Sequence, residues 1–137
     1  MAALDDLGGE ARLRTLVEQF YDLVENLPEG SNLRRLHGRG HGVDHARVEQ
    51  FNFLSGFMGG RPYYREKYGH MDVKLMHEHV PIRQDDADNW LFCMNRALDD
   101  EGHNGPHIDK LRAVFQRVAQ ILVNDVPDWE ETGTRRP

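Results

Sequence analysis

The apolar residues of this 137-residue chain recur at intervals of three and four almost from end to end. That spacing places them on one face of an α-helix, whereas a half-buried strand needs alternation with a period of two. Because no segment alternates in that way, we expect an all-α protein with essentially no sheet. The length suits a single domain whose core is large enough to enclose one cofactor.

Four long segments and one short one carry the helical pattern, and Gly or Pro separates them. Each long segment has one apolar stripe, so we expect two antiparallel helix pairs packed face to face. The Gly-rich stretch 28–42 is expected to be a loop or short turn, and 127–137 a frayed tail behind a domain over 1–126. The helices are expected over about 13–27, 43–58 and 69–78, then from just after Asp85-Asp86 to about 98, and from about 106 to 122.

The composition excludes several classes of partner. A formal net charge of −6 argues against nucleic acid as a partner, because a phosphate-binding surface is basic. No apolar run approaches the roughly 20 residues needed to cross a bilayer, so no membrane partner is expected. The N-terminus lacks a basic region followed by an apolar stretch, which argues against a secretory signal. The single cysteine, Cys93, forms no internal disulfide, which fits a cytoplasmic protein.

Histidine is the unusual feature of the composition, with eight residues of which six fall between His37 and His79. His77 lies in KLMHEHVP at the end of the short helical segment, where an imidazole can face an apolar pocket. Taken by spacing alone, it is more often a core histidine bonded to a carbonyl than a ligand. A zinc site with His79 has little support, because residues two apart on a helix point roughly 200° apart and no Cys pair or HExxH motif is present.

Three hydrogen-bond donors interrupt apolar faces on three different helices: Tyr21, Gln50 and Trp90. A buried hydroxyl, amide or indole N–H needs a partner. Each one alone can be a boundary residue with its polar tip in water. Together they favour one enclosed site that several helices approach.

Taken together, these motifs resemble those of the group II truncated haemoglobins. GGEARLRTLVEQFYDLV resembles the opening of that family with its Phe-Tyr pair, and FLSGFMGGRPYYREKYGH resembles its Phe-Leu, Gly-Gly, Tyr and Gly-His run. His77 falls where the family keeps its proximal histidine, and WLFCMNRAL begins thirteen residues later, like the family's Trp-Leu-x-Cys-Met segment. The resemblance extends over about residues 7–125.

The resemblance implies a compact 2-on-2 globin fold that holds haem b, with His77 as the proximal iron ligand. Tyr21 and Trp90 would donate hydrogen bonds to a ligand on the distal side, next to Phe20. His37 matches the helix corner where the family has Tyr, Phe or His. The remaining distal positions are Gln50 and Ala46, and the haem wall would be formed by Phe53 and Phe57.

The chain departs from the family around the proximal histidine. Met71, Met76 and His79 stand where the family often has Pro, Arg and Pro, which puts the usual haem-carboxylate contacts in doubt. Tyr64, Lys74 and His79 are the substitutes we expect. His41 and His45 compete with His37 for its role, and any of these three or Tyr21 is a candidate for the sixth iron site.

The implied function is reversible binding of oxygen and other diatomic ligands, including NO and CO. Two or three distal donors, each worth roughly 0.5–1.5 kcal/mol, predict tight binding and slow release. The alternatives are a nitric-oxide dioxygenase or peroxidase served by a reductase, and a cofactor-free helical interaction module. A monomer or homodimer is compatible with the sequence.

Overall fold

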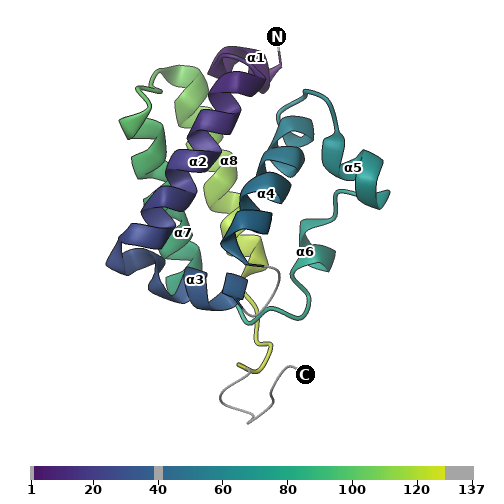
Figure 1. Cartoon of the computed structure of the whole chain (residues 1–137), viewed down its shortest axis with the longest axis vertical. Coiled ribbons are helices and arrows are strands. Elements are labelled where there is room, and N and C mark those ends of the chain that lie inside the picture. Colours follow the sequence, from purple (N-terminus) through teal and green to yellow (C-terminus); the bar gives the residue numbers. More distant parts are fainter. Residues whose placement is uncertain (1, 39–41, 129–137) are drawn as a thin grey trace.

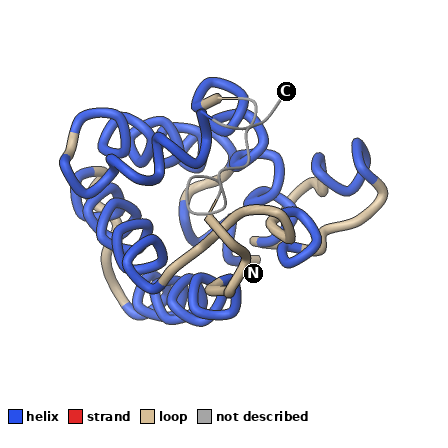
Figure 2. The backbone as a smooth tube through the Cα atoms, turned by 90° about the horizontal axis from the view of Figure 1, so that it is seen from below, coloured by secondary structure: helices blue, strands red, loops and turns tan. Residues whose placement is uncertain are grey.

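The computed structural model describes residues 2–38 and 42–128. Within these ranges every regular element is a helix, and Figure 2 shows helices joined by loops with no strand. The expectation of an all-α protein is therefore confirmed. The helices are α1 (Ala3–Leu7), α2 (Glu10–Asn26), the 3₁₀ turn η1 (Pro28–Gly30), α3 (Ser31–Gly38), α4 (Val43–Phe57), α5 (Tyr63–Tyr68), α6 (Val73–Met76), α7 (Gln84–Asp100) and α8 (Pro106–Leu122).

Two antiparallel pairs of long helices form the body of the molecule. Helices α2 and α4 make one pair and α7 and α8 the other, and α2 lies against α7 to join the pairs (Figure 1). This is the arrangement of two helices over two that the stripes predict. No helix of the described chain is both long and apolar enough to span a membrane.

The core lies where α2 crosses α7. Leu13, Leu16 and Phe20 of α2 are fully buried, as are Met94 and Leu98 of α7. These residues recur at three and four along each helix, so both stripes face inward. Full burial of each large side chain contributes roughly 1.5–3 kcal/mol, which makes this crossing the main source of stability.

The expectation of a loop over 28–42 is wrong for its first part, which folds into η1 and α3. Leu33 and Leu36 of α3 are buried, and Arg34 donates to the carbonyl oxygens of Val24 and Leu27 at 2.5 and 3.1 Å. Those bonds satisfy backbone acceptors at the end of α2. Gly30 is required here, because a Cβ would lie 2.0 Å from the Val24 oxygen. The structure does not describe residues 39–41, which include His41.

Three further short helices depart from the expectation. The helix predicted over 69–78 is shortened to the four residues of α6, while α1 and α5 were not predicted. Such short pieces gain little from their own hydrogen bonds, so tertiary contacts decide whether they form. Leu4 of α1, for example, is buried and its amide donates to the Met58 oxygen at 2.9 Å. Of the predicted tail, only residues 127 and 128 lie in the described part of the chain.

Candidate functional site

His77 is the residue that follows the last turn of α6. Asp72 caps the start of this helix by accepting from the Leu75 amide at 3.0 Å. The Nδ1 atom of His77 lies 2.6 Å from the Val73 oxygen, and its backbone oxygen accepts from the Val80 amide at 3.0 Å. A carbonyl partner makes Nδ1 the protonated nitrogen, so the Nε2 lone pair is left for a metal ion. The half-buried imidazole is therefore able to bind a metal ion through Nε2.

Tyr21 is 2% exposed, and its hydroxyl has no hydrogen-bond partner among the described residues. Phe20 holds the ring in an edge contact, with centroids 4.7 Å apart. Burial raises the pKa of Tyr21, and Arg47 opposes this, so the hydroxyl keeps its proton and is a donor. An unsatisfied buried hydroxyl costs about 1–3 kcal/mol, and a ligand that accepts its hydrogen bond would recover that cost.

His37 lies at the end of α3 and faces Tyr21 edge-on, with ring centroids 5.7 Å apart. Its Nδ1 atom lies 2.7 Å from the Leu33 oxygen, which leaves Nε2 available on the other side of the ring. Burial lowers the pKa of His37, the Leu33 carbonyl raises it, and a charge on His77 lowers it again.

Trp90 of α7 completes a line of three aromatic rings across the bundle. Its ring centroid lies 5.2 Å from that of Phe20 and 5.5 Å from that of Phe115. The indole is half-buried, and its N–H has no hydrogen-bond acceptor in the part of the chain that the structure describes. Tyr21 and Trp90 therefore flank the same buried Phe20 and are both donors without an acceptor.

Helix α4 and the start of α5 supply an aromatic wall. Phe53 stacks on Phe57 at 5.6 Å and meets Tyr64 edge-on at 5.8 Å. Ala46 and Gln50 are half-buried on the same helix, and the Gln50 amide has no partner among the described residues. The structure thus brings Phe20, Tyr21, His37 and Trp90 into contact, and places Phe53, Phe57 and Tyr64 in a second aromatic group.

Two of the three residues expected to hold the carboxylates of haem lie at the surface, whereas the third, Tyr64, is half-buried. Lys74 is exposed, and His79 is 90% exposed and pairs with Glu78 at 3.2 Å. His45, a candidate for the sixth iron site, is exposed as well. Within the described residues no group of three or more His, Cys, Asp or Glu is placed to hold a metal ion, so a zinc site gains no support.

Arg47 is a residue near the site that the sequence interpretation missed. It pairs with Glu18, Asp22 and Glu25 of α2 at 2.5, 2.9 and 3.0 Å, and lies 5.9 Å from the centre of the Tyr21 ring. Three carboxylates at intervals of four and three on one helix, opposite an arginine on the next, were the available signal. The arginine fastens α2 to α4 beside Tyr21.

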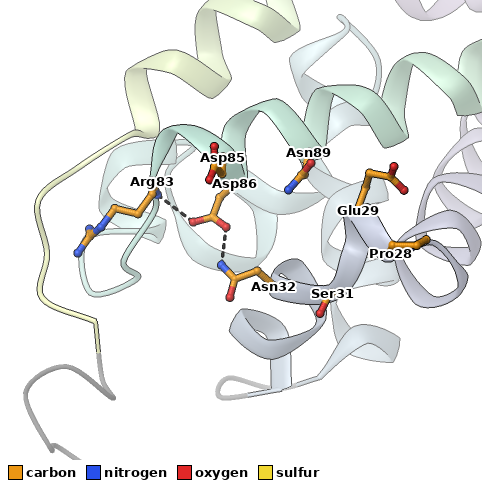
Figure 3. A pocket seen from close by; sticks show the side chains of 8 residues that line it. All are labelled: Pro28, Glu29, Ser31, Asn32, Arg83, Asp85, Asp86 and Asn89. Carbon is orange, nitrogen blue, oxygen red and sulfur yellow. Dashed lines mark hydrogen bonds between the residues drawn. The ribbon is translucent and has the colours of Figure 1, made fainter.

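Haem can be tested against this site by its chemical needs. Haem iron needs an imidazole nitrogen with a free lone pair, which His77 offers at Nε2. A diatomic ligand that carries negative charge needs donors, and Tyr21 and Trp90 are buried or half-buried donors without acceptors. The residues therefore fit a haem group. Of the two cavities described, neither is lined by His77; one of about 340 Å³ lies between α3 and the start of α7 (Figure 3).

Comparison with known proteins gives a consistent result. The family model of the bacterial-like globins matches residues 2–124. The chain is 34% identical to the group 2 truncated hemoglobin YjbI of Bacillus subtilis over 116 residues, which is 85% of this chain and 84% of that protein. The group II 2-on-2 hemoglobin of Agrobacterium tumefaciens superposes with a TM-score of 0.84 at 31% identity, over 90% of this chain and 95% of that one. The truncated oxygen-avid haemoglobin of Bacillus subtilis superposes with a TM-score of 0.81 at 31% identity, over 90% and 100%.

Proposed function

Because this chain belongs to the group II truncated haemoglobins of the bacterial-like globin family, we propose that it binds haem b through His77 and holds oxygen tightly through Tyr21 and Trp90. Family membership establishes the 2-on-2 globin fold and supports haem-based binding of diatomic gases. Haem, when bound, supplies the iron at which such a ligand coordinates. The residues of this chain supply the proximal nitrogen and the distal donors.

The buried hydroxyl of Tyr21 is the observation that carries the proposal. It has no acceptor among the described residues, and its raised pKa keeps it protonated. A ligand with partial negative charge in the pocket would accept this hydrogen bond and a second one from Trp90. Each bond contributes roughly 0.5–1.5 kcal/mol, so the pair predicts release slower by about 10- to 100-fold. The similar haemoglobin from Bacillus subtilis is described as oxygen-avid, which supports tight binding of oxygen.

Stopped-flow measurement of oxygen release tests the proposal. We expect Tyr21→Phe and Trp90→Phe each to accelerate release by about tenfold, because each removes one donor and keeps the ring. Tyr68→Phe is the matched control, since that tyrosine is 41% exposed. Release at the wild-type rate in both donor variants would contradict the proposal.

Several narrower sequence predictions belong to this proposal. On burial and ring placement, Tyr21 and His37 are better candidates for the sixth iron site than the exposed His45. His41 lies outside the described residues. Contacts of Tyr64, Lys74 and His79 with haem carboxylates, a cytoplasmic location, a reductase partner and a monomeric or dimeric state stay predictions.

A further inference from the structure

The segment 123–128, named here the C-terminal strap, connects parts of the molecule that are distant in sequence. It leaves the end of α8 and runs beneath the bundle beside the loop from α6 to α7 (Figure 1). In that loop, the residues next to the strap are Val80 to Ile82. Val80 follows His77 by three positions. The strap therefore lies against the segment that follows the proximal histidine.

Asn124 binds this segment with both its backbone and its side chain. Its amide donates to the Ile82 oxygen at 2.9 Å, and its Oδ1 atom accepts from the Ile82 amide at 3.3 Å. Its Nδ2 group donates to the Val80 oxygen at 2.9 Å. The Val80 amide in turn donates to the His77 oxygen at 3.0 Å. The Asn124 side chain thus binds Ile82 and also Val80, the residue whose amide bonds the His77 oxygen.

The other end of the strap holds α3. Asp128 accepts two bonds from the guanidinium of Arg35, at 2.7 and 3.2 Å, and the pair is only 20–29% exposed. Planar two-bond pairing of this kind fixes orientation as well as distance. Arg35 lies two residues before His37, on the same short helix.

A chain of polar contacts joins the two ends through the start of α7, as Figure 3 shows in part. Arg35 donates to Asn32 at 2.6 Å, and Asn32 donates to the buried carboxylate of Asp86. Asp86 accepts from the Arg83 amide at 2.9 Å, and the Arg83 side chain donates to the Asn124 oxygen at 3.1 Å. These contacts begin at the Arg35 partner of Asp128 and end at Asn124, so they connect the two ends of the strap.

We propose that the strap is a positioning device for both sides of the ligand site. Asn124 fixes the position of the segment that carries His77. Asp128 fixes, through Arg35, the position of the helix that carries His37. Asn124 is a positioning residue, because it acts on His77 through Val80. The inference rests on the proposed function, since it concerns the placement of the proximal and distal residues of that site.

Amide hydrogen exchange, followed residue by residue by NMR on the full chain, tests the proximal half. In Asn124→Ala we expect amide exchange at Val80 and Ile82 to accelerate about tenfold. The Ile82 amide loses its acceptor, and Val80 loses the side-chain donor that holds its carbonyl oxygen. Asn124→Asp keeps the acceptor for the Ile82 amide and is expected to keep that amide protected. Gln120→Ala is the matched control, because Gln120 lies on the last turn of α8 and bonds Gln84 instead. Unchanged exchange at Val80 and Ile82, or equal acceleration at Leu13 and Leu16 in α2, overturns the inference.

Resonance Raman spectra of the ferrous haem-loaded protein give a second readout that a general loss of stability does not move. We expect Asn124→Ala to shift the iron–histidine stretching frequency, and Asp128→Asn to leave it in place while accelerating oxygen release. The same frequency in wild type and Asn124→Ala overturns the proximal half, and wild-type release in Asp128→Asn overturns the distal half. A protein that takes up no haem refutes the proposed function, while the exchange experiment still decides whether the strap holds Val80 and Ile82.

Discussion

Helices α2 and α6 carry or precede the residues of the proposed ligand site but are built in opposite ways. Helix α2 has 17 residues, of which seven are buried, and it carries Phe20 and Tyr21. Helix α6 has four residues, none of them buried, and it precedes His77. The donors for a ligand are thus placed by the core itself. His77, the proposed proximal ligand, is placed by the N-cap of α6, by its own bond to Val73 and by Asn124 on the distant strap.

This difference means that the side chains that stabilise the fold are not the ones that fix the position of His77. A buried residue of α2 cannot move without opening the core, so the packing of the core fixes the position of Tyr21. A residue on α6 is held by a few hydrogen bonds, which makes local opening there much easier than global unfolding.

The largest difference is expected for truncations of apolar side chains. Phe20→Ala is expected to lower the free energy of unfolding by about 3–5 kcal/mol, because Phe20 is fully buried between Tyr21 and Trp90. Leu75→Ala on α6 is expected to cost under about 0.5 kcal/mol, because that leucine is 48% exposed. Urea unfolding of the haem-free protein measures both. Equal costs would show that α6 belongs to the core.

The sequence predicts the long helices of the molecule but not the short ones. The long helices α2, α4, α7 and α8 follow from the apolar period, and so do the buried Leu13, Leu16, Met94 and Leu98. The short helices do not, because they depend on contacts that the apolar period does not contain, such as the bond from the Leu4 amide of α1 to the Met58 oxygen. Tyr21 and Trp90 stand out as donors on apolar faces. The roles of Arg47 and Asn124 depend on partners far away in the chain.

A smaller difference is expected between two arginines. Arg47→Met is expected to cost about 1–2 kcal/mol, because its side chain is 15% exposed and three carboxylates of α2 lose their partner. Arg61→Met, near α5, is expected to cost clearly less, because Arg61 and Glu66 are 61% and 46% exposed and water screens their attraction. Urea unfolding at low and high salt measures both. A loss that is equally small for both would show that Arg47 does not fasten α2 to α4.

The smallest expected effect concerns pH. His103, next to the start of α8, is buried, and burial lowers its pKa, as do Arg12, His107 and Arg112. The unfolded chain therefore binds more protons than the folded one below about pH 6.5, so the stability present above that pH is lost as the pH falls. Unfolding of His103→Gln across pH 5–8 is expected to show a shallower decline. An unchanged slope would mean that other groups cause the acid sensitivity.

Haem titration of the purified protein, followed by its Soret absorption, tests whether the chain binds haem through His77. We expect saturation at one haem per chain, and a His77→Gly variant whose weakened binding and altered spectrum are restored by added imidazole. A wild-type protein that stays colourless would favour a cofactor-free helical module. A His77→Gly variant with the wild-type spectrum and affinity would show that another residue holds the iron.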